Sequence, residues 1–416
     1  MFLKALTCVL ALFACAANAQ PVVATEHQWT DDIVGSHVFQ LGMDAWHIHT
    51  SASEDTTENM NSLSRLQLAN SYPVWSSFRQ VSPWGRFDGG LRVGQDTLLT
   101  LKFRNDQSTG ARVDEASVDR AFHTFGVKLG VVDPKISWCR TYDVDSPWIR
   151  ENNPFCSIKP LNFARGSAPG GQAYANFIMG DYSLQAIAGA YRPLMFGYEA
   201  NVAPTIVLSS KDNVMDRTKT GFALSATNLK NGTEFRMSLM KDQYLTYRPE
   251  TTSAPARQKT MNADILFLGG AWYASEKLVL RGSYFMYEGP LEYTDFDLVT
   301  YVNLHDDKKN DALTFEVNYQ ANSRDVFSAA HATFGFYLDQ KLYRLNGNTP
   351  ELKSISFGTP EFVTKNTSLS WRRDWGRGMF TVLQFSDAQT NQSDSKKVLK
   401  LSSNGQAIGL RLGYRF

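Results

Sequence analysis

The side chains that could do chemistry in this chain are few, and the most suggestive are two histidines beside a serine. His47, His49 and Ser51 fall on alternate positions near the end of an expected strand, and hydrolases often use a serine that a histidine activates. Proximity alone supplies neither an orienting carboxylate nor an oxyanion donor. The sequence also has no phosphate-binding loop, zinc-protease motif or dinucleotide fingerprint. We therefore interpret these residues as strand-end side chains, and we expect no catalytic residue, metal or cofactor.

The final stretch, 408–416, reads IGLRLGYRF and alternates as a β-strand between two environments would. Its apolar residues share one parity, and its glycines and arginines share the other. A tilted strand of ~9–11 residues is long enough to cross the hydrocarbon layer of a bilayer. An edge strand of a soluble β-sandwich alternates in the same way. The choice between a membrane-spanning strand and such an edge strand therefore depends on the rest of the chain.

The first 19 residues have the layout of a secretory signal peptide. An apolar run follows Lys4 and ends in an A-x-A cleavage site at 17–19. A lipoprotein signal around Cys15 is the alternative, and the downstream A-x-A site favours ordinary cleavage. We expect a signal peptide over 1–19, a short periplasmic segment over 20–35, and the folded domain over 36–416.

Charge and hydropathy exclude two other classes. The chain has 42 Lys and Arg against 41 Asp and Glu, and removal of Lys4 with the leader makes the formal net charge zero. Binding of nucleic acid requires a basic surface, so we expect no nucleic-acid partner. After residue 20 there is no apolar run of ~18 residues, which argues against a membrane-spanning helix. The mean hydropathy of −0.30 does not exclude a barrel, because in-out alternation averages out.

Alternation with a period of two recurs along the chain. In 311–320, for example, Leu313 and Phe315 alternate with Thr314 and Glu316. The glycine-rich region 81–96 is ambiguous and could add a hairpin, so 14 and 18 strands are alternatives to 16. The 16 expected strands are 36–50, 63–80, 97–105, 118–131, 135–140, 172–179, 183–194, 218–229, 233–247, 261–273, 277–288, 311–320, 326–343, 366–374, 379–387 and 405–416.

The lengths of the connections argue for a barrel over a sandwich. Short turns rich in Gly, Asn, Asp and Ser, such as 180–181 and 231–232, alternate with long polar segments. Transmembrane barrels sort their connections in this way, with short turns at one rim and long loops at the other. The long segments are 106–117, 140–171, 195–217, 248–260, 289–310, 344–365 and 388–404.

The leader, the hairpins with long loops on one side and the final strand together resemble a Gram-negative outer-membrane porin. The resemblance implies an all-β transmembrane antiparallel barrel of about 16 strands in the outer membrane, with short periplasmic turns and long extracellular loops. It also implies contact with outer-membrane lipid, passage of small hydrophilic solutes or ions, and a homotrimer as an assembly to test. The end of the chain, with Leu412, Tyr414 and Phe416, resembles the C-terminal assembly signal of such barrels, which implies periplasmic chaperones and the barrel-assembly machinery as partners.

The segment 139–172 is the most informative loop. Cys139 and Cys156 are the only cysteines after the leader, and an oxidising compartment favours a disulfide between them. Two free thiols are the minor alternative, and a metal site is weaker still because no histidines cluster there. In the expected strand order this is the third outer loop, and the loop at that position folds into the lumen in trimeric porins.

By that resemblance, the segment is a candidate constriction whose mixed charges would create a transverse field. A loop that the disulfide merely protects from proteases is an equally weighted alternative. The candidate constriction residues are Asp143, Asp145, Arg150, Glu151, Lys159 and Arg165.

Charged residues on the polar parity of the strands are candidates for the pore lining. Basic residues outnumber acidic ones in this set, which slightly favours anions because pore-lining charge sets ion preference. Mutual neutralisation of pairs, or placement of arginines at the rim, is the alternative. The candidates are Lys102, Arg104, Lys128, Arg236, Arg281, Glu316, Arg372, Arg411 and Arg415.

The sequence thus predicts a porin, with no enzymatic activity, that passes small hydrophilic solutes by passive diffusion. One alternative is an outer-membrane barrel hydrolase acting on lipids. The stretch 402–405 (SSNG) resembles the Ser-Asn-Gly of barrel phospholipases, but the histidine expected two residues before the serine is absent. The other alternative is a closed barrel with a structural or receptor role.

Overall fold

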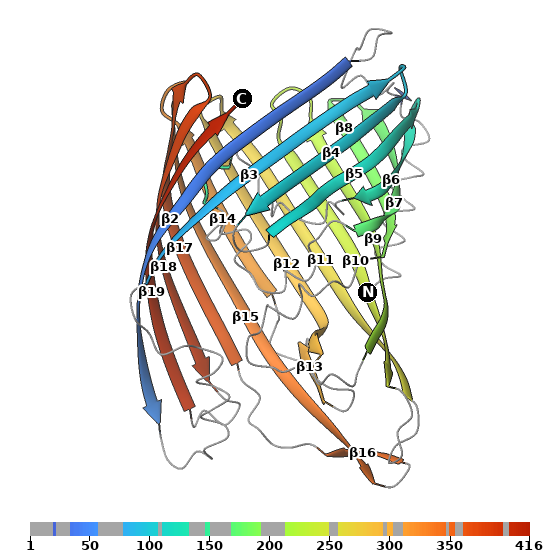
Figure 1. Ribbon diagram of the computed structural model, residues 1–416, viewed down its shortest axis with the longest axis vertical. Coiled ribbons are helices and arrows are strands. Elements are labelled where there is room, and N and C mark those ends of the chain that lie inside the picture. The colour runs from blue at the N-terminus through green and yellow to red at the C-terminus, as the bar shows by residue number, and fades with distance from the viewer. Residues whose placement is uncertain are drawn as a thin grey trace.

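A computed structural model describes residues 20–21, 34–56, 78–106, 110–132, 146–149, 168–192, 213–248, 257–293, 298–302, 311–346, 349–353, 361–393 and 399–416. These residues form a closed barrel of 16 antiparallel strands (Figure 1). Three short strands accompany the barrel: β1 (Gln20–Pro21) pairs with β7, β13 (Leu298–Val302) pairs with β12 and β15, and β16 (Thr349–Lys353) pairs with β15. The barrel strands are β2 (Val34–Thr56), β3 (Phe78–Val93), β4 (Thr97–Asp106), β5 (Gly110–Phe122), β6 (Phe125–Val132), β7 (Ala168–Met179), β8 (Tyr182–Tyr191), β9 (Asn213–Asn228), β10 (Glu234–Arg248), β11 (Arg257–Ser275), β12 (Leu278–Tyr293), β14 (Asp311–Gln320), β15 (Asp325–Asn346), β17 (Glu361–Gly376), β18 (Met379–Ser393) and β19 (Leu399–Arg415).

The last strand closes the barrel against the first. β19 pairs with β2 along its whole length, from Leu399 opposite Thr56 to Arg415 opposite Gln40. The amide of Phe416 then donates to the carbonyl of Phe39 at 2.8 Å. Full closure satisfies the backbone groups of both strands, which a bilayer requires.

Short turns gather at the rim where the chain ends. They connect β3 to β4, β5 to β6, β7 to β8, β9 to β10, β11 to β12, β14 to β15, and β17 to β18. Gly232, in the turn before β10, has a φ of 73°, a conformation that glycine adopts without strain. The opposite rim carries the longer connections, although two of them, 107–109 and 394–398, are short.

The predicted number of strands is confirmed, but the boundaries in the first third of the barrel were wrong. Most of the ambiguous region 81–96 lies in β3. The expected strand 63–80 overlaps β3 only at its end. The expected strand 118–131 is a hairpin of β5 and β6, and most of the expected loop 106–117 lies in β5. The turn at 123–124 escaped detection because it contains no glycine, proline, asparagine or aspartate. The expected strand 135–140 lies outside the described residues.

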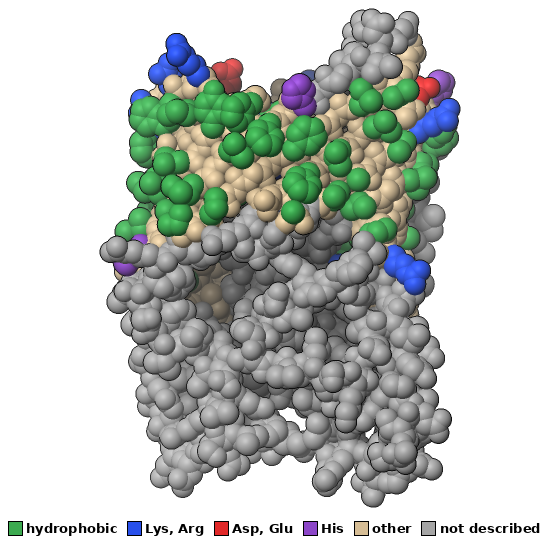
Figure 2. Space-filling view, viewed as in Figure 1, with side chains coloured by type: hydrophobic (Ala, Val, Ile, Leu, Met, Phe, Trp, Pro, Cys, Tyr) green, Lys and Arg blue, Asp and Glu red, His purple; other side chains and the backbone are tan. Residues whose placement is uncertain are grey.

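Apolar side chains cover the outside of the barrel as a belt towards the short-turn rim (Figure 2). In β14 the alternation is complete, because Leu313 and Phe315 are 61% and 50% exposed while Thr314 and Glu316 are each 1% exposed. Lipid-facing and lumen-facing residues alternate in this way in transmembrane barrels. Within the described residues, no helix is long and apolar enough to span a membrane. The exposed apolar side chains of the belt include Leu41, Met43, Leu101, Phe103, Val118, Leu129, Phe235, Leu313, Phe315, Leu369, Leu383, Phe385, Ile408, Leu410 and Leu412.

Aromatic rings mark the short-turn end of the belt. Phe416 contacts Phe39 and Tyr414, with ring centroids 5.8 Å and 4.5 Å apart. Phe122 and Phe125 stack at 5.2 Å across their turn. Rings at this level suit the headgroup region of a bilayer. The side chains of Leu412, Tyr414 and Phe416 all face outward here, and their role in assembly stays a prediction.

Candidate functional site: the inner wall and the segment 146–149

The inner wall is the polar face of the strands, opposite the apolar belt. The structure places all nine candidate lining residues on this parity, and it brings most of them into ion pairs with acidic side chains. Arg415 lies at the short-turn rim. A role in lining a pore stays a prediction for Lys102, Arg104, Lys128, Arg236, Arg281, Glu316, Arg372, Arg411 and Arg415.

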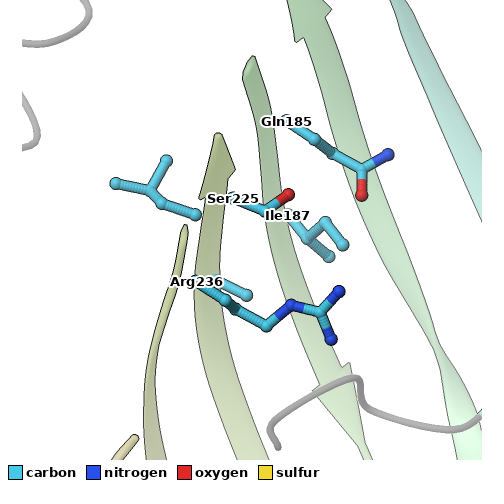
Figure 3. Close-up of a pocket in the computed structure, with 6 residues that line it drawn as sticks. Gln185, Ile187, Ser225 and Arg236 are labelled. Atoms are coloured by element: carbon cyan, nitrogen blue, oxygen red, sulfur yellow. The ribbon is translucent and has the colours of Figure 1, made fainter. Parts of the chain in front are cut away.

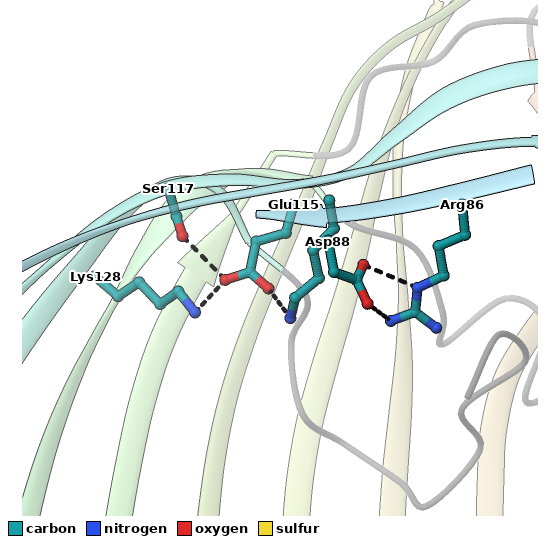
Figure 4. Close-up of polar contacts among 6 residues, drawn as sticks. Arg86, Asp88, Glu115, Ser117 and Lys128 are labelled. Atoms are coloured by element: carbon teal, nitrogen blue, oxygen red, sulfur yellow. Dashed lines mark hydrogen bonds and ion pairs between the residues drawn. The ribbon is translucent and has the colours of Figure 1, made fainter. Parts of the chain in front are cut away.

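Glu115 of β5 links two lysines from neighbouring strands (Figure 4). Its Oε2 accepts from Lys102 Nζ of β4 at 2.6 Å, and its Oε1 pairs with Lys128 Nζ of β6. The hydroxyl of Ser117 also donates to Oε1, at 3.0 Å. Both carboxylate oxygens are therefore engaged, and one negative charge offsets two positive ones.

Further charges continue on β3 to β5. The Arg86 guanidinium holds the Asp88 carboxylate through two contacts of 2.9 Å and 2.6 Å. Such bidentate geometry is the strongest form of this ion pair. Arg104, which is almost fully buried, lies 3.2 Å from Asp114.

Arg411 and Asp44 join the last strand to the first. Arg411 Nε and Nη2 donate to the two Asp44 oxygens at 2.8 Å and 2.7 Å, and the pair is buried. Trp84 Nε1 donates to Asp44 Oδ1 at 2.9 Å, and the Arg411 guanidinium lies 5.2 Å from the Trp84 ring centroid. Ion pair, hydrogen bond and cation-π contact thus all fix the seam where the barrel closes.

The other side of the barrel repeats the pairing of opposite charges. Arg281 of β12 lies 3.7 Å from Glu316 of β14. Lys219 of β9 lies 3.8 Å from Asp242 of β10, and both are buried. Arg236 pairs with Glu234 at 2.8 Å. Arg372 instead makes a cation-π contact, with its guanidinium 5.0 Å from the centroid of the Phe380 ring.

These pairs change the expected electrostatics of the wall. The positive surplus expected from the sequence is offset by acids that the sequence interpretation did not place there, notably Asp88, Asp114 and Glu115. They were missed because 81–96 and 106–117 were not assigned to strands. The alternation around Val113 and Val118, which both face outward, is the signal that could have revealed them.

Residues 146–149 lie inside the barrel. They belong to the connection between β6 and β7, which is the third connection at the long-loop rim. The amide of Ile149 donates to Gln384 Oε1 of β18 at 2.7 Å, and the Ile149 side chain is fully buried. The Trp148 side chain is also buried and lies near Glu316. This short segment therefore reaches from β6 and β7 to the opposite part of the inner wall.

The segment rests in an apolar niche on β18, β19 and β2. Ile149 clusters there with Trp46, Phe380, Val382 and Ala407, and Trp84 packs against the cluster. Two glycines make room for the rings: a Cβ on Gly409 would lie 2.4 Å from Trp46, and one on Gly413 would lie 2.2 Å from Phe380. The rings of Trp46 and Phe380 therefore lie over the two glycines, and both belong to the cluster that contains Ile149.

The sequence interpretation missed Ile149 and Gln384. No local pattern could reveal their contact, because Ile149 and Gln384 are 235 residues apart. The predicted disulfide between Cys139 and Cys156 lies outside the described residues and stays a prediction. So do the constriction roles of Asp143, Asp145, Arg150, Glu151, Lys159 and Arg165.

A small hollow opens on the inner wall between β8, β9 and β10 (Figure 3). Gln185, Ser225 and Arg236 line it together with Ile187. Gln185 is already committed to Asn176, to which its Nε2 donates at 3.0 Å. Ala223 and Leu224 complete the lining, which is therefore half apolar, and the hollow is too small to hold more than a fragment of a solute.

The histidine and serine stretches lie on the neighbouring strands β2 and β19, where Ser51 pairs with Asn404 and His49 with Gln406. His47 faces outward, next to Ile408 of β19. The backbones of Ser402 and Ser403 pair with Ser53 and Ala52. Among the described residues, no group of His, Cys, Asp and Glu could hold a metal ion.

Comparison with known proteins gives matches only among solved structures. No protein-family model matches the chain, and no curated protein matches it. The outer membrane channel DcaP of Acinetobacter baumannii is similar with 11% identity and a TM-score of 0.52, over 94% of this chain and 99% of that chain. The anion-selective porin from Comamonas acidovorans is similar with 9% identity and a TM-score of 0.53, over 92% of this chain and 100% of that chain. At such low identity these likenesses concern the fold.

The fold and its surface together define where the protein resides. A closed barrel satisfies every strand edge, and the apolar belt matches a hydrocarbon layer. The similar solved structures are outer-membrane barrels with the same architecture. The protein is therefore an outer-membrane β-barrel of a Gram-negative bacterium.

Proposed function

We propose that the protein is a porin, a channel for passive diffusion of small hydrophilic solutes across the outer membrane. One observation carries the proposal: charged side chains on the inner wall keep access to solvent. Lys102 on β4 and Arg281 on β12 are each 39% exposed, and the same number of strands separates them in either direction around the ring. Barrels of 16 strands are wide enough to hold an aqueous channel.

In this proposal, the barrel excludes large solutes by width and the third connection narrows the lumen. Segment 146–149 supports this, because Ile149 is held against the inner wall by Gln384 and the apolar niche. A disulfide between Cys139 and Cys156 would shorten the free part of the same connection. The short-turn rim, where the chain ends, faces the periplasm.

The proposal includes no chemistry and no cofactor, and a homotrimer is its expected assembly. The solved structures similar in fold include a channel and a porin by their names. Chemical crosslinking of the protein in mild detergent measures the assembly, with a trimer as the expected species and a monomer as the contradicting one.

Planar-bilayer recording of the purified protein tests the function. We expect stepwise increases in ion current as single barrels insert. A folded barrel without current would contradict a porin. If such a barrel releases fatty acid from detergent-mixed phospholipid, it is a hydrolase, and if it does not, it is a closed barrel with a structural or receptor role.

A further inference from the structure

Charges of alternating sign form a row along the inner wall from β3 to β6 (Figure 4). Asp88, Lys102 and Glu115 lie directly opposite one another on consecutive strands. Directly opposed side chains have Cβ atoms ~5 Å apart. Arg86 pairs with Asp88 at one end and Lys128 pairs with Glu115 at the other, so the order of signs is plus, minus, plus, minus, plus.

The two charges in this row that are most open to solvent have opposite signs and are neighbours. Lys102 is 39% exposed and Asp88 is 28% exposed, whereas Glu115 is 5% exposed beneath its two lysines. A solute that passes this wall therefore meets an ammonium and a carboxylate side by side, and it shares the first with Glu115 and the second with Arg86. Glu115 lies on the other side of Lys102 from Asp88 and offsets part of the charge of Lys102 and Lys128.

We propose that this row is a binding wall for small zwitterionic solutes, and that Glu115 prevents the wall from selecting anions. The proposal rests on the porin function above. A simple ion is attracted by one group and repelled by its neighbour, so its net attraction is small. A molecule with its own carboxylate and ammonium can place the first near Lys102 and the second near Asp88.

Several other charges on the described wall are also paired with the opposite sign. Arg281 and Glu316, Lys219 and Asp242, and Arg411 and Asp44 are such pairs. Closely paired charges cancel beyond a short distance, and salt screens what remains. In this proposal, the local row on β3 to β6 is the part of the described wall that attracts the solute.

Reversal potentials in a KCl gradient test the role of Glu115. Wild-type channels should discriminate weakly between potassium and chloride. Glu115→Gln leaves the ammonium groups of Lys102 and Lys128 without their shared carboxylate, so the reversal potential should move towards that of chloride. Asp387→Asn is the matched control, because it removes the same charge from an exposed outward position. An unchanged potential in Glu115→Gln, or an equal shift in the control, would overturn the role of Glu115.

Liposome swelling tests the solute class with three probes of similar size: L-alanine, L-lactate and L-lactamide. Wild-type protein should admit the zwitterion L-alanine severalfold faster than the anion or the neutral amide. Lys102→Met keeps Glu115 paired with Lys128, so it should remove the preference for L-alanine without making the channel prefer L-lactate. If Glu115→Gln does not fold, Lys102→Met still tests whether the row selects zwitterions.

The outcomes separate the two proposals. Equal rates for the three probes, or faster entry of L-lactate into wild-type liposomes, would overturn the zwitterion proposal and leave the porin function standing. No swelling with any probe, from protein that is folded in the liposomes, would overturn the porin function itself.

Discussion

Ile149 is the residue whose replacement should most directly release the segment inside the barrel. Its side chain is fully buried among Trp46, Phe380, Val382 and Ala407. Ile149→Ala removes most of this apolar contact while leaving the amide that donates to Gln384. The barrel strands themselves are unchanged, so the effect should fall on docking of the segment and not on folding of the barrel.

The size of the effect follows from the burial of Ile149. Replacing a buried isoleucine by alanine costs ~2–5 kcal/mol, whereas a neutral hydrogen bond such as that to Gln384 contributes ~1 kcal/mol. Because ~1.4 kcal/mol is tenfold in an equilibrium constant, the ratio of docked to undocked segment should fall by about thirtyfold to several thousandfold. The variant should therefore spend a larger fraction of time undocked than the wild type does.

Single-channel recording should detect the release as a higher conductance or as switching between two levels. Ile408→Ala is the matched control, since Ile408 faces outward in the belt, and its conductance should equal that of wild type. A single conductance level in Ile149→Ala that is identical to wild type would refute the claim that this segment narrows the lumen.

Three further predictions concern stability, the loop and assembly. Arg411→Gln leaves the buried Asp44 carboxylate without its counter-charge and should destabilise the barrel by ~3–5 kcal/mol, measured as a lower temperature of heat modification. A wild-type temperature would contradict this. Alkylation without reductant should leave Cys139 and Cys156 unmodified in the mass spectrum, because a disulfide closing this loop stabilises by ~3 kcal/mol; two alkyl groups would contradict the disulfide. Deletion of Phe416 should lower the amount of heat-modifiable barrel in the outer membrane, and an unchanged amount would argue against an assembly signal.

Alternation of residue types was sufficient to predict a closed barrel, because each strand lies between lipid and a polar lumen. The total of 16 strands is also right, although the expected strand 118–131 is two strands. It was insufficient where the pattern is interrupted. The turn after Phe122 has no turn residues, and its His123 adopts a φ of 52°. In β3, glycines at 85 and 89 weakened the apolar parity although the strand is continuous.

The electrostatics of the wall could be predicted only in part. The parity of Lys102, Arg411 and Asp44 followed from their strands. The pairing of Arg411 with Asp44, and of Lys102 with Glu115, became evident only with the register of neighbouring strands. The contact of Ile149 with the far wall depends on the path of a loop through the interior. Local periodicity carries no information about that path, so the niche could not be anticipated.

The most direct test of which face is wet compares two neighbouring positions on β4. Lys102→Cys would place a thiol on the inner wall, and Leu101→Cys would place one in the apolar belt. A membrane-impermeant, charged thiol reagent applied to bilayers with single channels should modify Lys102→Cys and reduce its current, and leave Leu101→Cys unchanged. Modification of Leu101→Cys with no reaction at Lys102→Cys would show that the assignment of lipid-facing and water-facing sides is wrong.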